Sequence, residues 1–139
     1  MSMDTIGKYP TTLMYDILQC ALETWSCQFW AQIYSYKWYW WHETDKDGEP
    51  IDDTVNPEIT PDTVLLKVRD ASEEREEDAT WVDITPQKLV DATDWALEKY
   101  NHLFSWHTNQ NGIRDDIDYD AIGADVILQK VVLGDAVYG

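Results

Sequence analysis

The chain has 139 residues and carries 27 acidic against 10 basic side chains, which gives a formal net charge of −17 at pH 7. Hydrophobic residues make up 44% of it and include eight tryptophans and eight tyrosines, enough apolar area for one folded domain, so wholesale disorder is excluded. The charge also disfavours direct binding to nucleic acid or to an anionic membrane, because both are held by Lys and Arg.

The first predicted helix covers about residues 12–33. Pro10 followed by Thr11 or Thr12 is typical of a helix start, and the apolar residues that follow recur with the 3.6-residue period. A second stripe extends around the helix, formed by Cys20, Glu23, Cys27, Trp30 and Tyr34. A helix that is apolar on most sides is central in a fold or lies in an oligomer interface. Cys20 and Cys27 would be roughly 10 Å apart along this helix, too far for a disulfide.

The middle of the chain predicts strands. Residues 34–41 read YSYKWYWW and favour a strand, and residues 42–62 contain Gly and Pro and read as an irregular loop. Two further strands are predicted at residues 63–70 and 79–85, and a highly charged connection joins them.

The last third predicts two helices. Thr85 and Pro86 form a cap and first-turn pair that opens a helix over about 86–100. Residues 101–117 read as loop, a last helix starts at Asp118 or Asp120 and stops at Gly134, and the tail 135–139 is expected to add a short strand. The order predicts a single α+β domain with three main helices and a small antiparallel sheet.

The excess charge lies mainly in three connecting segments, residues 43–62, 70–78 and 115–125. Three interpretations stay open: an ordinary solvated surface, adaptation to high salt, since Asp outnumbers Glu 18 to 9, or a surface that binds a basic partner. The candidate partner-binding residues are Asp45, Asp47, Glu49, Asp52, Asp53, Glu73, Glu74, Glu76, Glu77, Asp78, Asp115, Asp116, Asp118 and Asp120.

The motifs of catalysis and metal binding fail when their spacing is checked. Asp116, Asp118 and Asp120 fit the first positions of a calcium loop, but Ala121 and Ile127 stand where that loop needs Gly and Glu. His102 and His107 match no zinc spacing, and no nucleophile elbow, phosphate loop or dinucleotide motif is present. We therefore expect a protein that is not an enzyme and uses no metal or cofactor.

An aromatic cluster gives the chain a second candidate surface. Nine rings fall between residues 25 and 41, and a strand can send only alternate side chains into the core. The others would face solvent, a second copy of the chain or a pocket that stacks a flat ligand. Glu23 either faces solvent or is a partly buried acceptor. The residues of this candidate ligand site are Glu23, Trp25, Trp30, Tyr34, Tyr36, Trp38, Trp40 and Trp41.

Three stretches together resemble a family of small acidic proteins of tailed phages, prophages and other mobile elements. They are DILQCALETWSCQFW, the hairpin VLLKVRDASEEREEDATWVDITPQKLVDAT and the ending IDYDAIGADVILQKVVLGDAVYG. The family pattern has ALEGG followed by an aromatic-Trp pair, an acidic hairpin closed by a Trp strand, and an ending like ADxIVQxALFGExxYG. The matching residues are Ala21, Leu22, Glu23, Trp81, Ala124, Asp125, Val126, Gln129, Gly134, Tyr138 and Gly139. Thr24 and Trp25 replace the two glycines, and Phe29 and Trp30 are shifted by about one residue.

The resemblance implies a viral accessory protein of the host cell cytoplasm, an expectation that agrees with the absence of a secretion signal or long apolar run. The leading hypothesis is a non-catalytic protein that counters host defence by binding a basic macromolecule through acidic, DNA-mimicking segments. The first alternative is a sponge for a small nucleotide signal, in which Lys37, Lys67 and Arg69 are the few cations near the strands. A small virion component, and association of copies of the chain, also stay open.

Overall fold

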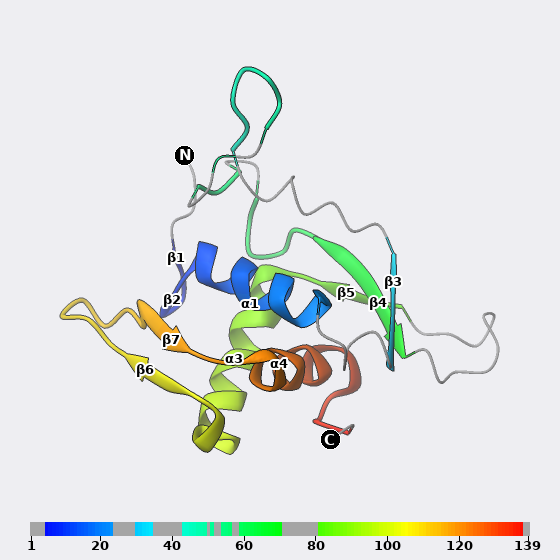
Figure 1. Ribbon diagram of the computed structural model, residues 1–139, viewed down its shortest axis with the longest axis vertical. Helices are drawn as coiled ribbons and strands as arrows, with labels where there is room; N and C mark the ends of the chain where they lie inside the picture. The colour runs from blue at the N-terminus through cyan, green and yellow to red at the C-terminus, as the bar shows by residue number, and fades with distance from the viewer. Residues whose placement is uncertain are drawn as a thin grey trace.

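The computed structural model (Figure 1) describes residues 5–23, 30–34, 43–49, 51, 54–56, 59–70 and 81–137. In these residues three helices are combined with short antiparallel strands, which confirms the predicted α+β class. The three helices and a three-stranded sheet surround one hydrophobic core.

The N-terminal part is a tight hairpin followed directly by a helix. β1 (Thr5–Ile6) pairs with β2 (Tyr9–Pro10), and α1 (Thr11–Glu23) begins at the predicted threonine. The prediction that this helix continues to residue 33 is wrong, because Ala31–Tyr34 forms strand β3. All four β3 residues pair with β4 (Leu66–Asp70), from Ala31 opposite Asp70 to Tyr34 opposite Lys67. Strand pairing here overrides a helical periodicity.

The main sheet has the order β3-β4-β5 and is antiparallel throughout. β5 (Val82–Ile84) completes the hairpin that the sequence predicts, although both strands are shorter than expected. Leu66 and Val68 are buried while Lys67 between them is exposed, so one face covers the core and the other faces outward. The predicted strand 34–41 meets the structure only at Tyr34, because its other residues lie outside the described part.

The two later helices begin and end where the sequence indicates. α3 (Pro86–Lys99) is capped by Thr85, whose side chain accepts a hydrogen bond from the Lys88 amide at 3.2 Å. α4 (Ala121–Leu133) is capped by Asp120 and ends at Gly134, which has a φ of 81°.

The central helix is α4. Every residue from Gly123 to Gln129 is buried, and α4 packs against α1, α3, β4 and β5. α1 buries one face and exposes Asp16 and Glu23, so of the two predicted places for the first helix, the centre of the fold is occupied by α4 instead, and an oligomer interface stays a prediction. The segment ADVILQ is buried on all sides because α1, α3, β4 and β5 pack around it.

Residues 101–117 are structured, contrary to the loop that the sequence predicts. A 3₁₀ helix, η3 (Asn101–Leu103), leads into β6 (Ser105–His107), which pairs with β7 (Asp116–Asp118). The hairpin turn carries Asn111 and Gly112, the latter with a φ of 78°. Asn-Gly is a strong hairpin signal that the sequence reading missed. The expected terminal strand is absent from residues 135–137, the described part of the tail.

Candidate functional site

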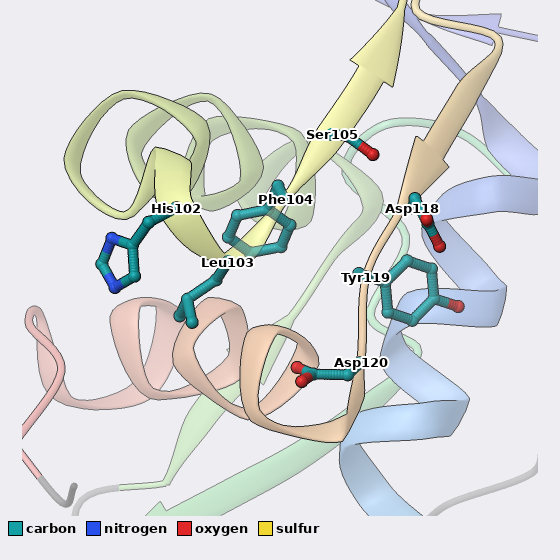
Figure 2. A pocket seen from close by; sticks show the side chains of 7 residues that line it. All are labelled: His102, Leu103, Phe104, Ser105, Asp118, Tyr119 and Asp120. Atoms are coloured by element: carbon teal, nitrogen blue, oxygen red, sulfur yellow. The ribbon is translucent and has the colours of Figure 1, made fainter.

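An open pocket of about 350 Å³ lies where β6, β7 and the start of α4 meet. Figure 2 shows Asp118, Tyr119 and Asp120 following one another from β7 into α4, with the ring of Phe104 across from them. Ser105 directs its hydroxyl towards β7, and His102 extends away at the rim. We call this the acidic pocket, and its lining consists of His102, Leu103, Phe104, Ser105, Asp118, Tyr119 and Asp120.

The strand register explains why these side chains share one site. Ser105 lies opposite Asp118 in the β6–β7 ladder, and Asp116 and Asp118 are exposed on either side of the buried Ile117. Asp120 follows two residues later, at the helix start. Phe104 is buried, and its ring can approach α4 closely because Gly123 has no Cβ. The pocket therefore combines two carboxylates and a hydroxyl with an aromatic wall.

A second depression of about 360 Å³ adjoins the acidic pocket along α1. Its lining is Asp16, Gln19, Cys20, Glu23 and Ala121, and Ala121 is the residue that follows Asp120. Burial raises the pKa of the Cys20 thiol, and the carboxylates of Glu23 and Asp120 raise it further. Burial also raises the pKa of Tyr119 to about 12, with further contributions from Cys20 and Asp16. Because these groups influence one another, the acidic pocket and the α1 depression belong to one negatively charged surface.

The candidate acidic residues of this region differ in their local roles. The Asp120 carboxylate accepts a hydrogen bond from the Gly123 amide at 2.9 Å and so caps α4. Asp115 lies 2.9 Å from His107 Nδ1, a contact that holds the pKa of the Asp115 carboxyl below its usual range. Outside the backbone ladder, the carboxylates of Asp116 and Asp118 have no hydrogen bond or ion pair with any described residue. These last two carboxylates are therefore the ones available to a partner.

Asp45, Asp47 and Glu49 lie elsewhere on the molecule. Their loop projects at one end of the long axis, whereas β6 and η3 lie towards the other (Figure 1). All three residues are exposed, but Asp45 stabilises its own turn by accepting from the amides of Asp47 at 2.8 Å and Glu49 at 3.0 Å. The structure thus separates this group from Asp116 and Asp118.

Trp30 belongs to the core, so its assignment to a ligand-stacking surface is wrong. Its side chain is 2% exposed, and its indole nitrogen donates to Asp125 Oδ1 at 2.9 Å. Gln129 donates to the other oxygen of Asp125 at 2.7 Å and accepts from the Val137 amide at 2.8 Å. Asp125 and Gln129 of α4 thus join the residue before β3 and the tail in a buried network.

Glu23 faces solvent at the last turn of α1, one of the two alternatives left by the sequence. It is exposed and accepts a weak hydrogen bond of 3.4 Å from Gln19 within the α1 depression. Tyr34 ends β3. The remaining candidates lie outside the described residues, namely Asp52, Asp53, Glu73, Glu74, Glu76, Glu77, Asp78, Trp25, Tyr36, Trp38, Trp40 and Trp41.

Sequence reasoning missed Phe104, Ser105, Tyr119 and Asp16 as parts of the site. The Asn111-Gly112 turn predicts the hairpin, and with it the pairing of Ser105 with Asp118. The approach of Asp16 on α1 depends on how the helices pack, so no local pattern reports it.

The described residues were searched for metal-binding groups and for helices able to cross a membrane. They contain no group of three or more His, Cys, Asp or Glu side chains placed to hold a metal ion. Among the helices of the described part, none has the length and apolarity to cross a membrane.

Comparisons with known proteins found no relative. No protein-family model matches the chain, and neither a search of curated proteins nor a search of solved structures returned a match.

Proposed function

We propose that this chain is a non-catalytic viral accessory protein that counters a host defence system by binding a basic macromolecule. The binding surface consists of the acidic pocket and the neighbouring carboxylates of β7 and α1. The observation that carries the proposal is the pair Asp116 and Asp118, two exposed carboxylates without a partner among the described residues. Unpaired like charges repel each other, and an approaching cation removes that cost.

The distribution of cations supports this direction. Of eight basic residues in the described part, five contact groups of the protein itself. These are Lys67, Arg69, Lys88, Arg114 and Lys130. The bases of the described part therefore neutralise little of the surface around the acidic pocket, none of whose lining residues is Lys or Arg.

The pocket chemistry suits an arginine or lysine side chain of the partner. Asp118 supplies a free carboxylate for the cationic head, the capping carboxylate of Asp120 adds negative charge beside it, and the ring of Phe104 offers an apolar wall for the stem. The volume of about 350 Å³ falls within the range of ligand sites. A partner that normally binds DNA phosphates would present such side chains in a row, which is the basis of DNA mimicry.

The test is a capture experiment from lysate of a bacterial host at low and at high salt. The bait is the wild-type protein, the double variant Asp116→Asn/Asp118→Asn, or the matched control Asp47→Asn/Glu49→Gln, which removes the same charge elsewhere. A captured protein should be released by duplex DNA and by salt, and only the Asp116/Asp118 variant should fail to retain it.

Two results would reject the proposal. One is equal capture by all three baits, which would show that binding depends on total charge or on another surface. The other is a captured protein that duplex DNA does not displace, which would exclude competition for a nucleic-acid groove.

A small anionic ligand of nucleotide type is a second candidate, favoured by the outer face of the β3-β4-β5 sheet. Arg69 donates from Nε to Gln32 Oε1 at 2.6 Å, and its guanidinium lies 5.4 Å from the centre of the Trp81 ring. Its Nη1 is buried without a hydrogen-bond acceptor among the described residues. A buried donor of this kind gains from an anionic acceptor.

Calorimetry with a panel of cyclic nucleotides and ADP-ribose derivatives tests the second candidate. A nucleotide that binds the wild type should lose affinity with Arg69→Gln and keep it with Lys88→Gln, which removes a cation from α3. Flat titrations across the panel would rule out the sponge.

A further inference from the structure

The β6–β7 hairpin carries part of the acidic pocket but has little support of its own. Each strand has three residues, and an isolated two-stranded hairpin is marginal in water. Within the two strands only Ile117 is buried. The position of Ser105 and Asp118 must therefore be fixed by contacts between the hairpin and the rest of the fold.

Arg114 makes the polar contacts of this kind. Its Nη1 donates to the Tyr9 hydroxyl at 2.7 Å and to Asp94 Oδ1 at 3.2 Å, and its backbone amide donates to the Lys8 carbonyl at 2.6 Å. Tyr9 is fully buried and its hydroxyl in turn donates to Asp94. A single residue next to β7 is thus attached to the N-terminal hairpin and to α3.

The guanidinium also contacts the opposite strand of its own hairpin. It lies 5.8 Å from the Trp106 ring of β6 and 5.7 Å from the Tyr9 ring. Trp106 is 40% exposed, so the guanidinium meets a ring that is only partly covered by the rest of the fold. A planar, permanently charged fork can stack on rings while it donates hydrogen bonds, which an ammonium group cannot do equally well.

We infer that Arg114 is a positioning residue for the acidic pocket: it fixes the β6–β7 hairpin on the body of the protein, and with it Ser105 and Asp118. The part of this inference that concerns binding rests on the proposed function, whereas the part that concerns the hairpin does not.

Electrostatics alone and positioning predict opposite effects of removing this cation. Arg114→Gln makes the protein more negative, so a purely electrostatic account predicts tighter binding of a basic peptide. Positioning predicts weaker binding, because the hairpin moves and the carboxylates no longer converge. Lys8→Gln is the matched control, since it removes a cation from the same corner of the protein. The Lys8 side chain makes no hydrogen bond, ion pair or ring contact with a described residue.

The experiment combines hydrogen exchange with the affinity of a short arginine-rich peptide at low salt. For Arg114→Gln we expect exchange of the amides in residues 105–118 to rise about tenfold and affinity to fall by about threefold or more, with the α4 amides still protected. Lys8→Gln should leave exchange unchanged and bind equally or slightly more tightly. Arg114→Lys retains the charge but should still raise hairpin exchange, and it serves as the second variant if Arg114→Gln does not fold.

The possible results distinguish the positioning role of Arg114 from the proposed function. Unchanged hairpin exchange in both Arg114 variants would overturn the positioning role, whatever the peptide does. Increased exchange with tighter peptide binding would also overturn it, since the hairpin would then not determine the site. If the wild type does not bind the peptide while hairpin exchange rises as expected, the proposed function fails and the structural role of Arg114 stands.

Discussion

Gly123→Ala tests how the wall of the acidic pocket is built. A Cβ at this position would lie 2.9 Å from Phe104 Cε1 and 3.1 Å from Phe104 Cζ, which is too close for two carbon atoms. The Phe104 side chain is buried and lines the pocket, so a displaced ring can move into the pocket. The substitution should therefore displace the ring and reduce the pocket.

Two opposing effects set the change in the free energy of unfolding that Gly123→Ala causes. Alanine in place of glycine stabilises a helix by about 1 kcal/mol, and forcing an extra methyl group into a packed site typically costs about 1–3 kcal/mol. We expect the free energy of unfolding to fall by about 1 kcal/mol, which lowers the Tm by roughly 4 °C for a domain of this size.

A double-mutant cycle separates the two effects. Phe104→Leu removes the ring, so in that background Gly123→Ala should stabilise by about 1 kcal/mol, and the coupling between the two sites should be about 2 kcal/mol. Urea unfolding of the four proteins, followed by circular dichroism, measures both quantities. Equal effects of Gly123→Ala in the two backgrounds would refute the close contact between Phe104 and α4.

Three further predictions address charge, burial and pH. Asp120→Asn should preserve the α4 cap and the free energy of unfolding, whereas Asp120→Ala should lower that free energy by about 1 kcal/mol. Urea unfolding of both variants distinguishes the contribution of the cap from that of the charge, and equal losses would contradict the capping role. Trp30→Phe removes the buried donor to Asp125 and should lower the free energy of unfolding by about 1–3 kcal/mol. An unchanged free energy of unfolding in the same assay would contradict a stabilising role of the buried network. Because burial raises the pKa of Tyr119 to about 12 from an unfolded value near 10, its stabilisation is complete below about pH 10 and is lost as the pH rises towards 12. Tyr119→Phe should therefore reduce the loss of stability between about pH 8 and pH 11 in urea unfolding, and an unchanged loss would contradict the assignment.

Local signals account for the parts of the fold that the sequence predicted. Thr85-Pro86 and Gly134 define helix ends through capping geometry that involves only neighbouring residues, and the structure confirms both. The two strands around the charged connection also follow from local alternation and composition, and their antiparallel pairing is confirmed.

Long-range pairing explains the errors. Nothing in the 12–33 periodicity reports that Ala31–Tyr34 will pair with β4, more than thirty residues away. Trp30 looked like a stacking residue because its local sequence is aromatic, but its partner, Asp125, lies 95 residues later in the chain. The predicted loop over residues 101–117 is wrong for a different reason, since the Asn111-Gly112 turn is a local signal for the β6–β7 hairpin.

The candidate site also depends partly on local signals and partly on long-range packing. Asp116, Asp118 and Asp120 stand out in the sequence by charge density alone, yet only the strand register and the helix cap distinguish the available carboxylates from the structural one. The convergence with Asp16 and Glu23 arises from packing of α1 beside the start of α4. Charge density thus identifies a region, whereas tertiary structure defines the surface.

The central claim is that the acidic pocket, and not total charge, binds the cationic partner. An NMR titration of the protein with a short arginine-rich peptide at low salt tests this claim directly, because each amide reports its own environment. We predict that the largest shifts occur at Ser105 and at Asp118–Asp120, and that Asp116→Asn/Asp118→Asn abolishes them while Asp47→Asn/Glu49→Gln does not. Shifts concentrated in the 43–49 loop, or spread evenly over all exposed carboxylates, would contradict the claim.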